Sequence, residues 1–242
     1  MVMTPTLAAT ATARSLSALG ATFMSDPRMN KRGRELGFEG IDFYFAGRAG
    51  VLGEVNADVA TAALVFFNPE TVAHAWNRSA GIMPRRDTAV NFAACAAAWA
   101  DDHLGDGVDY DELLALAERI VASAPNVLAP IFAGWRTLDQ PVGTKRRVTH
   151  AMNALRELRM ARHAAALLAH GVQIGDAVRH RQPTMTQMFG WDAGAADALV
   201  VERWKDAEAL TDEIVGNSYA VLGPDELSRF VELSVAASRA VR

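Results

Sequence analysis

The stretch from His150 to Gly171, HAMNALRELRMARHAAALLAHG, contains no proline and no internal glycine, so we expect it to form one continuous helix. At 100° per residue, Met152 and Leu155 fall on one side of that helix, whereas Ala164 and Leu168 fall on another. A helix that is apolar on two sides needs neighbouring elements on both. The sequence therefore predicts a central helix inside a multi-helix bundle.

The rest of the chain also shows helical periodicity, and no stretch alternates as a β-strand would. Asn56 is the expected N-cap of a helix over 57–67, and Asn68 precedes a proline that opens the next helix. The stretch 25–30, SDPRMN, is expected to be a loop. The predicted fold class is all-α, a multi-helix bundle.

Two segments are expected on either side of the stretch HRQPT. Residues 1–182 would form a helical ligand-binding bundle, and residues 183–242 would pack on it and serve packing or dimerisation. A homodimer is the expected assembly.

The composition is that of an ordinary globular protein, with 50% hydrophobic and 21% charged residues in a chain of 242. No apolar run reaches the roughly 18–20 residues that a membrane span needs, and the N-terminal stretch does not resemble a signal peptide. The single cysteine, Cys95, excludes an intramolecular disulfide. We therefore expect a cytoplasmic protein without a membrane partner.

Charge is distributed unevenly along the chain. The formal net charge is −4, yet residues 145–181 carry eight Lys/Arg and four histidines against only Glu157 and Asp176. A basic segment in an acidic protein favours an anionic partner, such as a phosphate, a carboxylate, a cofactor or nucleic acid. The alternative is a solvated helix face. No cofactor can be identified from the sequence.

Arg159, Arg162 and His163 interrupt the apolar faces of the predicted central helix. A buried arginine needs a carboxylate, a set of backbone carbonyls or a ligand anion as its partner. If the protein is an enzyme, a question that the sequence leaves open, His163 or Glu157 would be the catalytic proton-transfer group. His150 is a further candidate ligand-binding residue on this helix. It lies seven residues before Glu157, about 10 Å along a helix, which is too far for the two to share a metal ion easily. No metal site is predicted.

A second group of candidate ligand-binding residues lies near the N-terminus. Arg48, in the glycine-rich stretch GRAG, follows Tyr44 by one helical turn, and together they could hold a carboxylate or a phosphate. The alternative is a helix end whose arginine satisfies nearby carbonyls. His74 and Trp76 are expected to line the core close to the FFNP stretch, where they could also border an apolar cavity.

Segments 42–76, 149–168 and 210–241 together resemble, in order and spacing, an actinobacterial family of helix-turn-helix proteins. That family has a YFAGRAAPLG-like motif, a middle helix similar to LREHRGDGH and a winged-helix-like segment. The residues that match are Tyr44, Gly47, Arg48, Leu52 and Gly53 in the first motif, and Leu155, Arg156, Glu157, Arg159 and His163 in the second. Leu158 departs from a frequent histidine of the family, which puts in doubt any chemistry that this histidine performs in relatives.

A larger departure follows Trp191. The resemblance implies a winged helix here, yet the chain continues almost directly into its last helices, which leaves little room for a recognition helix and a wing. Glu202, Asp206 and Glu208 place acidic groups where DNA phosphates would lie. We therefore expect only a degenerate winged-helix-like part in residues 183–242, and these features argue against DNA binding.

Three functions remain compatible with these patterns. The first is binding of a small organic anion in an interhelical pocket where Arg48 and Arg159 converge, as in an enzyme of a specialised actinobacterial pathway. The second is a ligand-responsive transcriptional regulator of winged-helix type, and the third is a non-catalytic scaffold.

Overall fold

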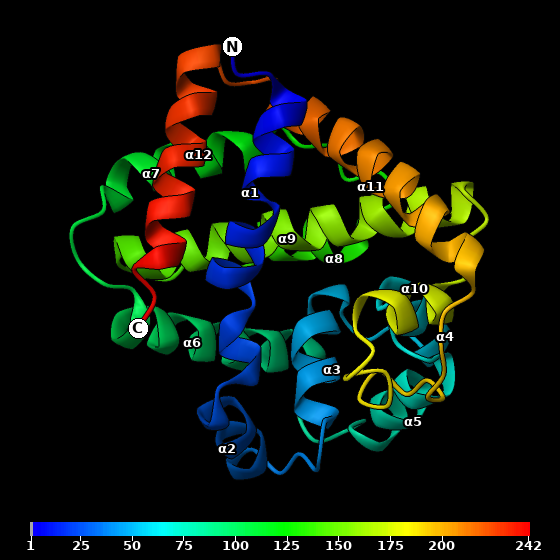
Figure 1. Ribbon diagram of the computed structural model, residues 1–242. Coiled ribbons are helices and arrows are strands. Elements are labelled where there is room, and N and C mark those ends of the chain that lie inside the picture. Colours follow the sequence, from blue (N-terminus) through cyan, green and yellow to red (C-terminus); the bar gives the residue numbers. More distant parts are fainter. Residues whose placement is uncertain (1) are drawn as a thin grey trace.

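Residues 2–242 are described by a computed structural model, and every regular element in this part of the chain is a helix (Figure 1). The all-α fold class is confirmed. The only β-type contact in the described part is an isolated bridge between Leu104 and Val241. The α-helices are α1 Pro5–Gly20, α2 Pro27–Glu35, α3 Asp42–Ala49, α4 Ala57–Ala63, α5 Pro69–Arg78, α6 Arg85–His103, α7 Tyr110–Ser123, α8 Pro130–Arg136, α9 Thr144–Ala169, α10 Ile174–Arg181, α11 Ala198–Tyr219 and α12 Pro224–Arg239.

Helix α9 is the central element, as predicted, and runs across the middle of the molecule with α1 and α11 on one side and α6 and α8 on others (Figure 1). Met152 and Leu155 are buried on one face, as predicted, and Ala164 is buried on another. The predicted place of Leu168 on that second buried face is wrong, because Leu168 is exposed and Leu167 is buried instead. The helix begins at Thr144, six residues before the sequence prediction. It begins there because Gly143 has a φ of 107°, a conformation that stops a helix from extending further back.

Side-chain caps fix several helix starts. Asn56 accepts a hydrogen bond from the Val59 amide, and Asn68 accepts one from the Glu70 amide, with Pro69 as the first helical residue, as predicted. The loop predicted for residues 25–30 is wrong from Pro27 onward. Asp26 caps the Arg28 amide and so starts helix α2 there.

The last two helices pack beside the first. In Figure 1, α1 lies between α11 and α12, so the two ends of the chain meet in one layer. Gly20 makes close packing of α1 possible, since a Cβ atom there would lie 2.5 Å from the Asn153 backbone nitrogen of α9. Tyr219 and Phe230 belong to the same hydrophobic core as Leu16.

Residues 183–242 contain a long connection followed by α11 and α12, with no β-hairpin. A winged-helix arrangement is therefore not confirmed there, and the division of the chain at residue 182 stays a prediction. None of the helices described for residues 2–242 combines the length and the apolar character that a membrane crossing requires.

Candidate functional site

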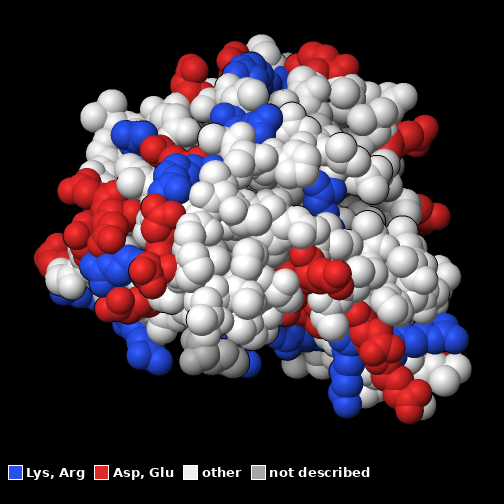
Figure 2. Space-filling view, turned by 90° about the horizontal axis from the view of Figure 1, so that it is seen from above, with Lys and Arg blue, Asp and Glu red and all other residues white. Residues whose placement is uncertain are grey.

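Much of the positive charge of residues 145–181 is neutralised by carboxylates from other parts of the fold. The pairs are Lys145–Asp106, Arg146–Asp101 and Arg147–Glu118, with Arg179–Asp176 inside the segment itself. On the face of the molecule shown in Figure 2, basic and acidic side chains are likewise mixed. The unevenness along the sequence thus largely disappears in three dimensions. Arg181, which pairs with no carboxylate of the described residues, lines a cavity together with other arginines.

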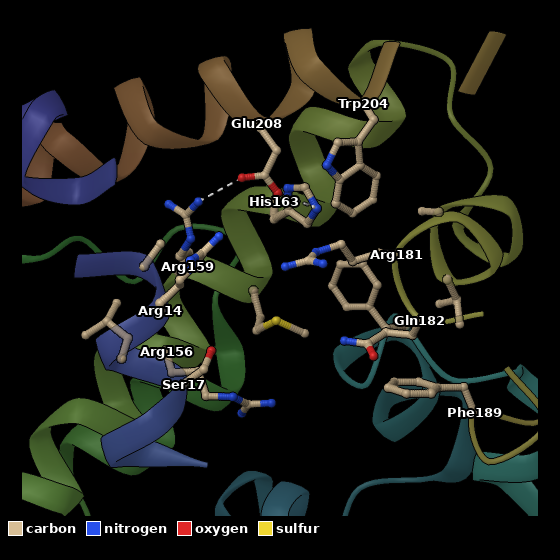
Figure 3. Close-up of a pocket in the computed structure, with 16 residues that line it drawn as sticks. Arg14, Ser17, Arg156, Arg159, His163, Arg181, Gln182, Phe189, Trp204 and Glu208 are labelled. Atoms are coloured by element: carbon tan, nitrogen blue, oxygen red, sulfur yellow. Dashed lines mark hydrogen bonds and ion pairs between the residues drawn. The ribbon is translucent and has the colours of Figure 1, made fainter. Parts of the chain in front are cut away.

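That cavity, which we call the arginine pocket, has a volume of about 400 Å³ and lies between α1, α9, α10 and α11 (Figure 3). Four arginines line it, Arg14 from α1, Arg156 and Arg159 from α9, and Arg181 from α10. Its walls also include apolar and aromatic side chains, among them Phe66, Met160, Phe189 and Trp204. Helix periodicity places both α9 arginines on the side that faces this space, because they are three residues apart.

Arg159 forms ion pairs with two carboxylates of α11. Its guanidinium donates to Asp212 at 2.6 Å and to Glu208 at 3.0 Å, and its side chain is 13% exposed. Asp212 also accepts a hydrogen bond from Thr10 at 2.7 Å. The two α11 carboxylates therefore hold Arg159 in place while it still lines the cavity.

The other three arginines are less fully neutralised. Arg156 donates to Glu157 at 2.7 Å, and no carboxylate of the described residues pairs with Arg14 or Arg181. In Figure 3, Arg181 reaches from α10 into the space between the helices. Counting Arg48, which shares Glu157 with Arg156, five arginines face three carboxylates, so the region keeps an excess of two positive charges.

Arg48 and Glu157 form a buried ion pair. Arg48 donates through Nε to Glu157 Oε1 at 2.7 Å and through a terminal nitrogen to Oε2 at 2.9 Å, and it also donates to the Tyr44 hydroxyl at 3.0 Å. Burial alone would raise the pKa of Glu157, but Arg48 and Arg156 outweigh it and hold that pKa below its usual value. Burial also opposes the charge of Arg48, and Glu157 more than compensates, so the pKa of Arg48 is raised.

The structure does not bring Arg48 and Arg159 to the same cavity. Arg48 lines a neighbouring cavity of about 240 Å³, and the link between the two regions is Glu157, which contacts both Arg48 and Arg156. Both oxygens of Glu157 are engaged and the carboxylate is held ionised, which favours a structural role. Its catalytic role stays a prediction.

His163 lies in the wall of the arginine pocket, 8% exposed, stacked on Phe66 and in edge contact with Trp204. Thr211 donates its hydroxyl proton to the Ala207 carbonyl, so it can only accept from His163 Nδ1, 3.0 Å away. We infer that the ring proton is on Nδ1. Nε2 has no hydrogen-bond partner and lies 3.5 Å from Glu208 Oε1.

The environment keeps this histidine neutral. Burial, with a smaller contribution from Arg159, lowers the pKa of His163 to about 4, although Asp212 acts in the opposite direction. Burial also raises the pKa of Glu208, against the influence of Arg159. The pair therefore offers an unprotonated Nε2 beside a carboxyl group that retains its proton more readily than usual.

The remaining predicted site residues lie elsewhere. Arg162 donates to the Pro125 and Val127 carbonyls, the backbone alternative considered above. His150 bonds the Trp135 carbonyl at 3.1 Å near the other end of α9, and burial lowers its pKa. Trp76 is buried and donates to the Val55 carbonyl.

The expected core position of His74 is wrong. His74 is exposed and lies beside Arg78, at 3.3 Å. It is two residues from Val72, about 200° around α5, whereas Val72 and Trp76 share the buried side.

The residues of the pocket that escaped prediction include Arg14, Arg181, Trp204 and Glu208. Arg181 was part of the basic segment, and its lack of a nearby acid in the sequence was a usable signal. Arg14 and Trp204 carry no such signal, because they meet His163 and Arg159 only through the packing of α1 and α11 on α9. No group of three or more His, Cys, Asp or Glu side chains in residues 2–242 is arranged to hold a metal ion.

Comparison with known proteins gives one finding. The model of a helix-turn-helix family matches residues 9–242, almost the whole chain. No curated protein and no solved structure shows a significant match.

Proposed function

The chain belongs to this helix-turn-helix family, and we propose that it binds a small organic anion in the arginine pocket. The observation that carries the proposal is the set of four arginines, from three helices, around one cavity with an excess of positive charge. Two of them, Arg14 and Arg181, have no carboxylate partner among residues 2–242. An anionic guest would complete their pairing.

The chemistry of the walls defines the class of guest. Guanidinium groups recognise carboxylates and phosphates through paired, charge-assisted hydrogen bonds. Phe66, Met160 and Trp204 supply an apolar surface for the rest of the molecule, and the volume lies in the range of small-molecule sites. The guest is therefore a carboxylate or phosphate attached to an apolar body.

A catalytic reaction is not required by this arrangement. The unprotonated Nε2 of His163 could accept a proton from a bound guest, with Glu208 beside it. This catalytic role of His163 stays a prediction of the sequence, as do the homodimer, the cytoplasmic location and the actinobacterial origin.

Replacing Arg181 with alanine is expected to weaken binding of benzoate and phenyl phosphate by about 10- to 100-fold, the usual effect of losing hydrogen bonds to a charged group. Isothermal titration calorimetry measures the dissociation constants directly, and the anion-induced rise in melting temperature gives an independent reading. Arg34→Ala is the matched control, because Arg34 is an exposed arginine on α2, outside the pocket. Equal binding by the wild type and Arg181→Ala, or no binding by the wild type, would contradict the proposal.

DNA binding is the second candidate function, and the family favours it. The sequence-based objection concerned residues 183–242, and the short helices α4 and α5 lie outside that segment. They pack against each other across a connection of five residues, 64–68, and α5 exposes His74 and Asn77. Two short helices joined in this way are the general form of a helix-turn-helix.

A DNA-binding regulator is expected to bind a fluorescently labelled duplex with an affinity that falls steeply with salt. With six or more phosphate contacts, the loss between 50 and 200 mM salt would be about a thousandfold or more. Fluorescence anisotropy at several salt concentrations measures the slope, and Asn77→Ala with His74→Ala tests whether α5 is the contacting element. An unchanged anisotropy at the lowest salt concentration would exclude this function.

A further inference from the structure

The second cavity, of about 240 Å³, borders α9 opposite the loop that precedes α8, and we call it the alanine groove. Small and aliphatic residues line it, including Ala62, Ala161, Ala164, Ala165, Leu128 and Leu168. The charged residues in its wall are Arg48 and Glu157, which bond each other through two hydrogen bonds. The groove therefore offers apolar contact and no unsatisfied charge.

The alanine groove and the arginine pocket share two wall residues, Phe66 and Met160. On α9, Arg156 and His163 face the arginine pocket, whereas Ala161 and Ala164 face the groove. At 100° per residue, Met160 lies between these two sets. The cavities thus occupy adjacent faces of one helix, with a flexible methionine side chain at their boundary.

The rim of the groove exposes two leucine side chains to solvent, and one of these residues has an unfavourable backbone conformation. Leu128 and Leu168 both line it and are 72% and 56% exposed. Leu128 has a φ of 54°, the one positive φ among non-glycine residues of the described part, and such a conformation is unfavourable for a residue with a Cβ atom. Arg162 holds this loop by donating to the Pro125 and Val127 carbonyls. The fold therefore fixes an apolar side chain at the mouth of an apolar groove.

We propose that the guest is amphiphilic, a medium-chain alkyl carboxylate or an equivalent acyl anion. Its charged group binds the arginines, and its hydrocarbon chain passes between Met160 and Phe66 into the alanine groove. The inference rests on the proposed function of the arginine pocket. A chain is required rather than a rigid ring, because the guest must bend from one face of α9 to the next.

The test is to titrate the protein with butanoate, hexanoate, octanoate and benzoate in turn, and to measure the dissociation constant of each anion by isothermal titration calorimetry. Each added methylene that enters the groove is expected to tighten binding about two- to fourfold. Ala165 is half-buried and lines the groove, so the larger side chain of Ala165→Leu would fill it. This variant is expected to abolish the gain in affinity with chain length, while its affinity for benzoate stays unchanged. Ala94→Leu, at an exposed alanine of α6, is the matched control and should keep the full gain.

Each outcome separates the two proposals. Benzoate binding without any dependence on chain length overturns the amphiphilic guest and leaves the arginine pocket standing, whereas no binding by any anion overturns both. A chain-length gain that survives in Ala165→Leu and in the second variant, Ala161→Leu, also overturns the inference. If the free protein is a dimer in analytical ultracentrifugation and Ala165→Leu dissociates it, the groove holds a second copy of the chain, and the inference fails.

Discussion

Glu157→Ala is expected to lower the free energy of unfolding by about 3–5 kcal/mol, the usual cost of leaving one buried charge without its partner. Arg48 is 4% exposed and would keep only the Tyr44 hydroxyl as a polar side-chain partner. Arg156 is different, since it lines the arginine pocket and can turn toward solvent. For a chain of this length the loss corresponds to a fall in melting temperature of roughly 6–20 °C.

Denaturation in guanidinium chloride and thermal unfolding both measure this effect. The double variant Arg48→Met with Glu157→Leu is expected to recover much of the loss, because an apolar pair of similar volume replaces the ions. Glu232→Ala, which removes an exposed partner of Arg229 within α12, serves as the surface control and should change stability very little. A Glu157→Ala protein as stable as the wild type would show that the ion pair is not the structural link between α3 and α9.

Acidification is expected to destabilise the protein through His163. The pKa of this ring is about 4 in the folded state, against 6.5 for the unperturbed side chain in the unfolded state. Between these pH values, the unfolded chain therefore binds a proton that the folded chain does not. The contribution of His163 to the free energy of unfolding is fully present above pH 6.5 and is lost as the pH falls toward 4. The full difference amounts to about 3 kcal/mol.

Urea denaturation of the wild type and His163→Gln, at pH values from 7.5 to 4, isolates this contribution as the difference between the two curves. Carboxylates remote from residue 163 titrate equally in both proteins and cancel in that difference. His74→Gln, at the exposed histidine of α5, is the control, and its curve should follow the wild type. Parallel curves for the wild type and His163→Gln would contradict the buried, neutral state of the ring.

Helix α9 shows how far local patterns reach. Its place at the centre of the bundle followed from two apolar faces, and the caps at Asn56 and Asn68 were visible as residue types beside helix starts. Helix α2 was missed where Asp26 caps it, because a short polar stretch with a proline also fits a loop. Periodicity and capping act over one or two helical turns, so the sequence carries them directly.

The ion pairs show where that reach ends. The sequence indicated that Arg48 and Arg159 need partners, but the partners lie 109 and 53 residues away, at Glu157 and Asp212. The turn of a helix determines which way each arginine points, and this much the sequence determined by itself. Which carboxylate meets it, and where a cavity with excess positive charge remains, was decided only when α1, α10 and α11 packed around α9, because Coulomb interactions and burial depend on distances in space.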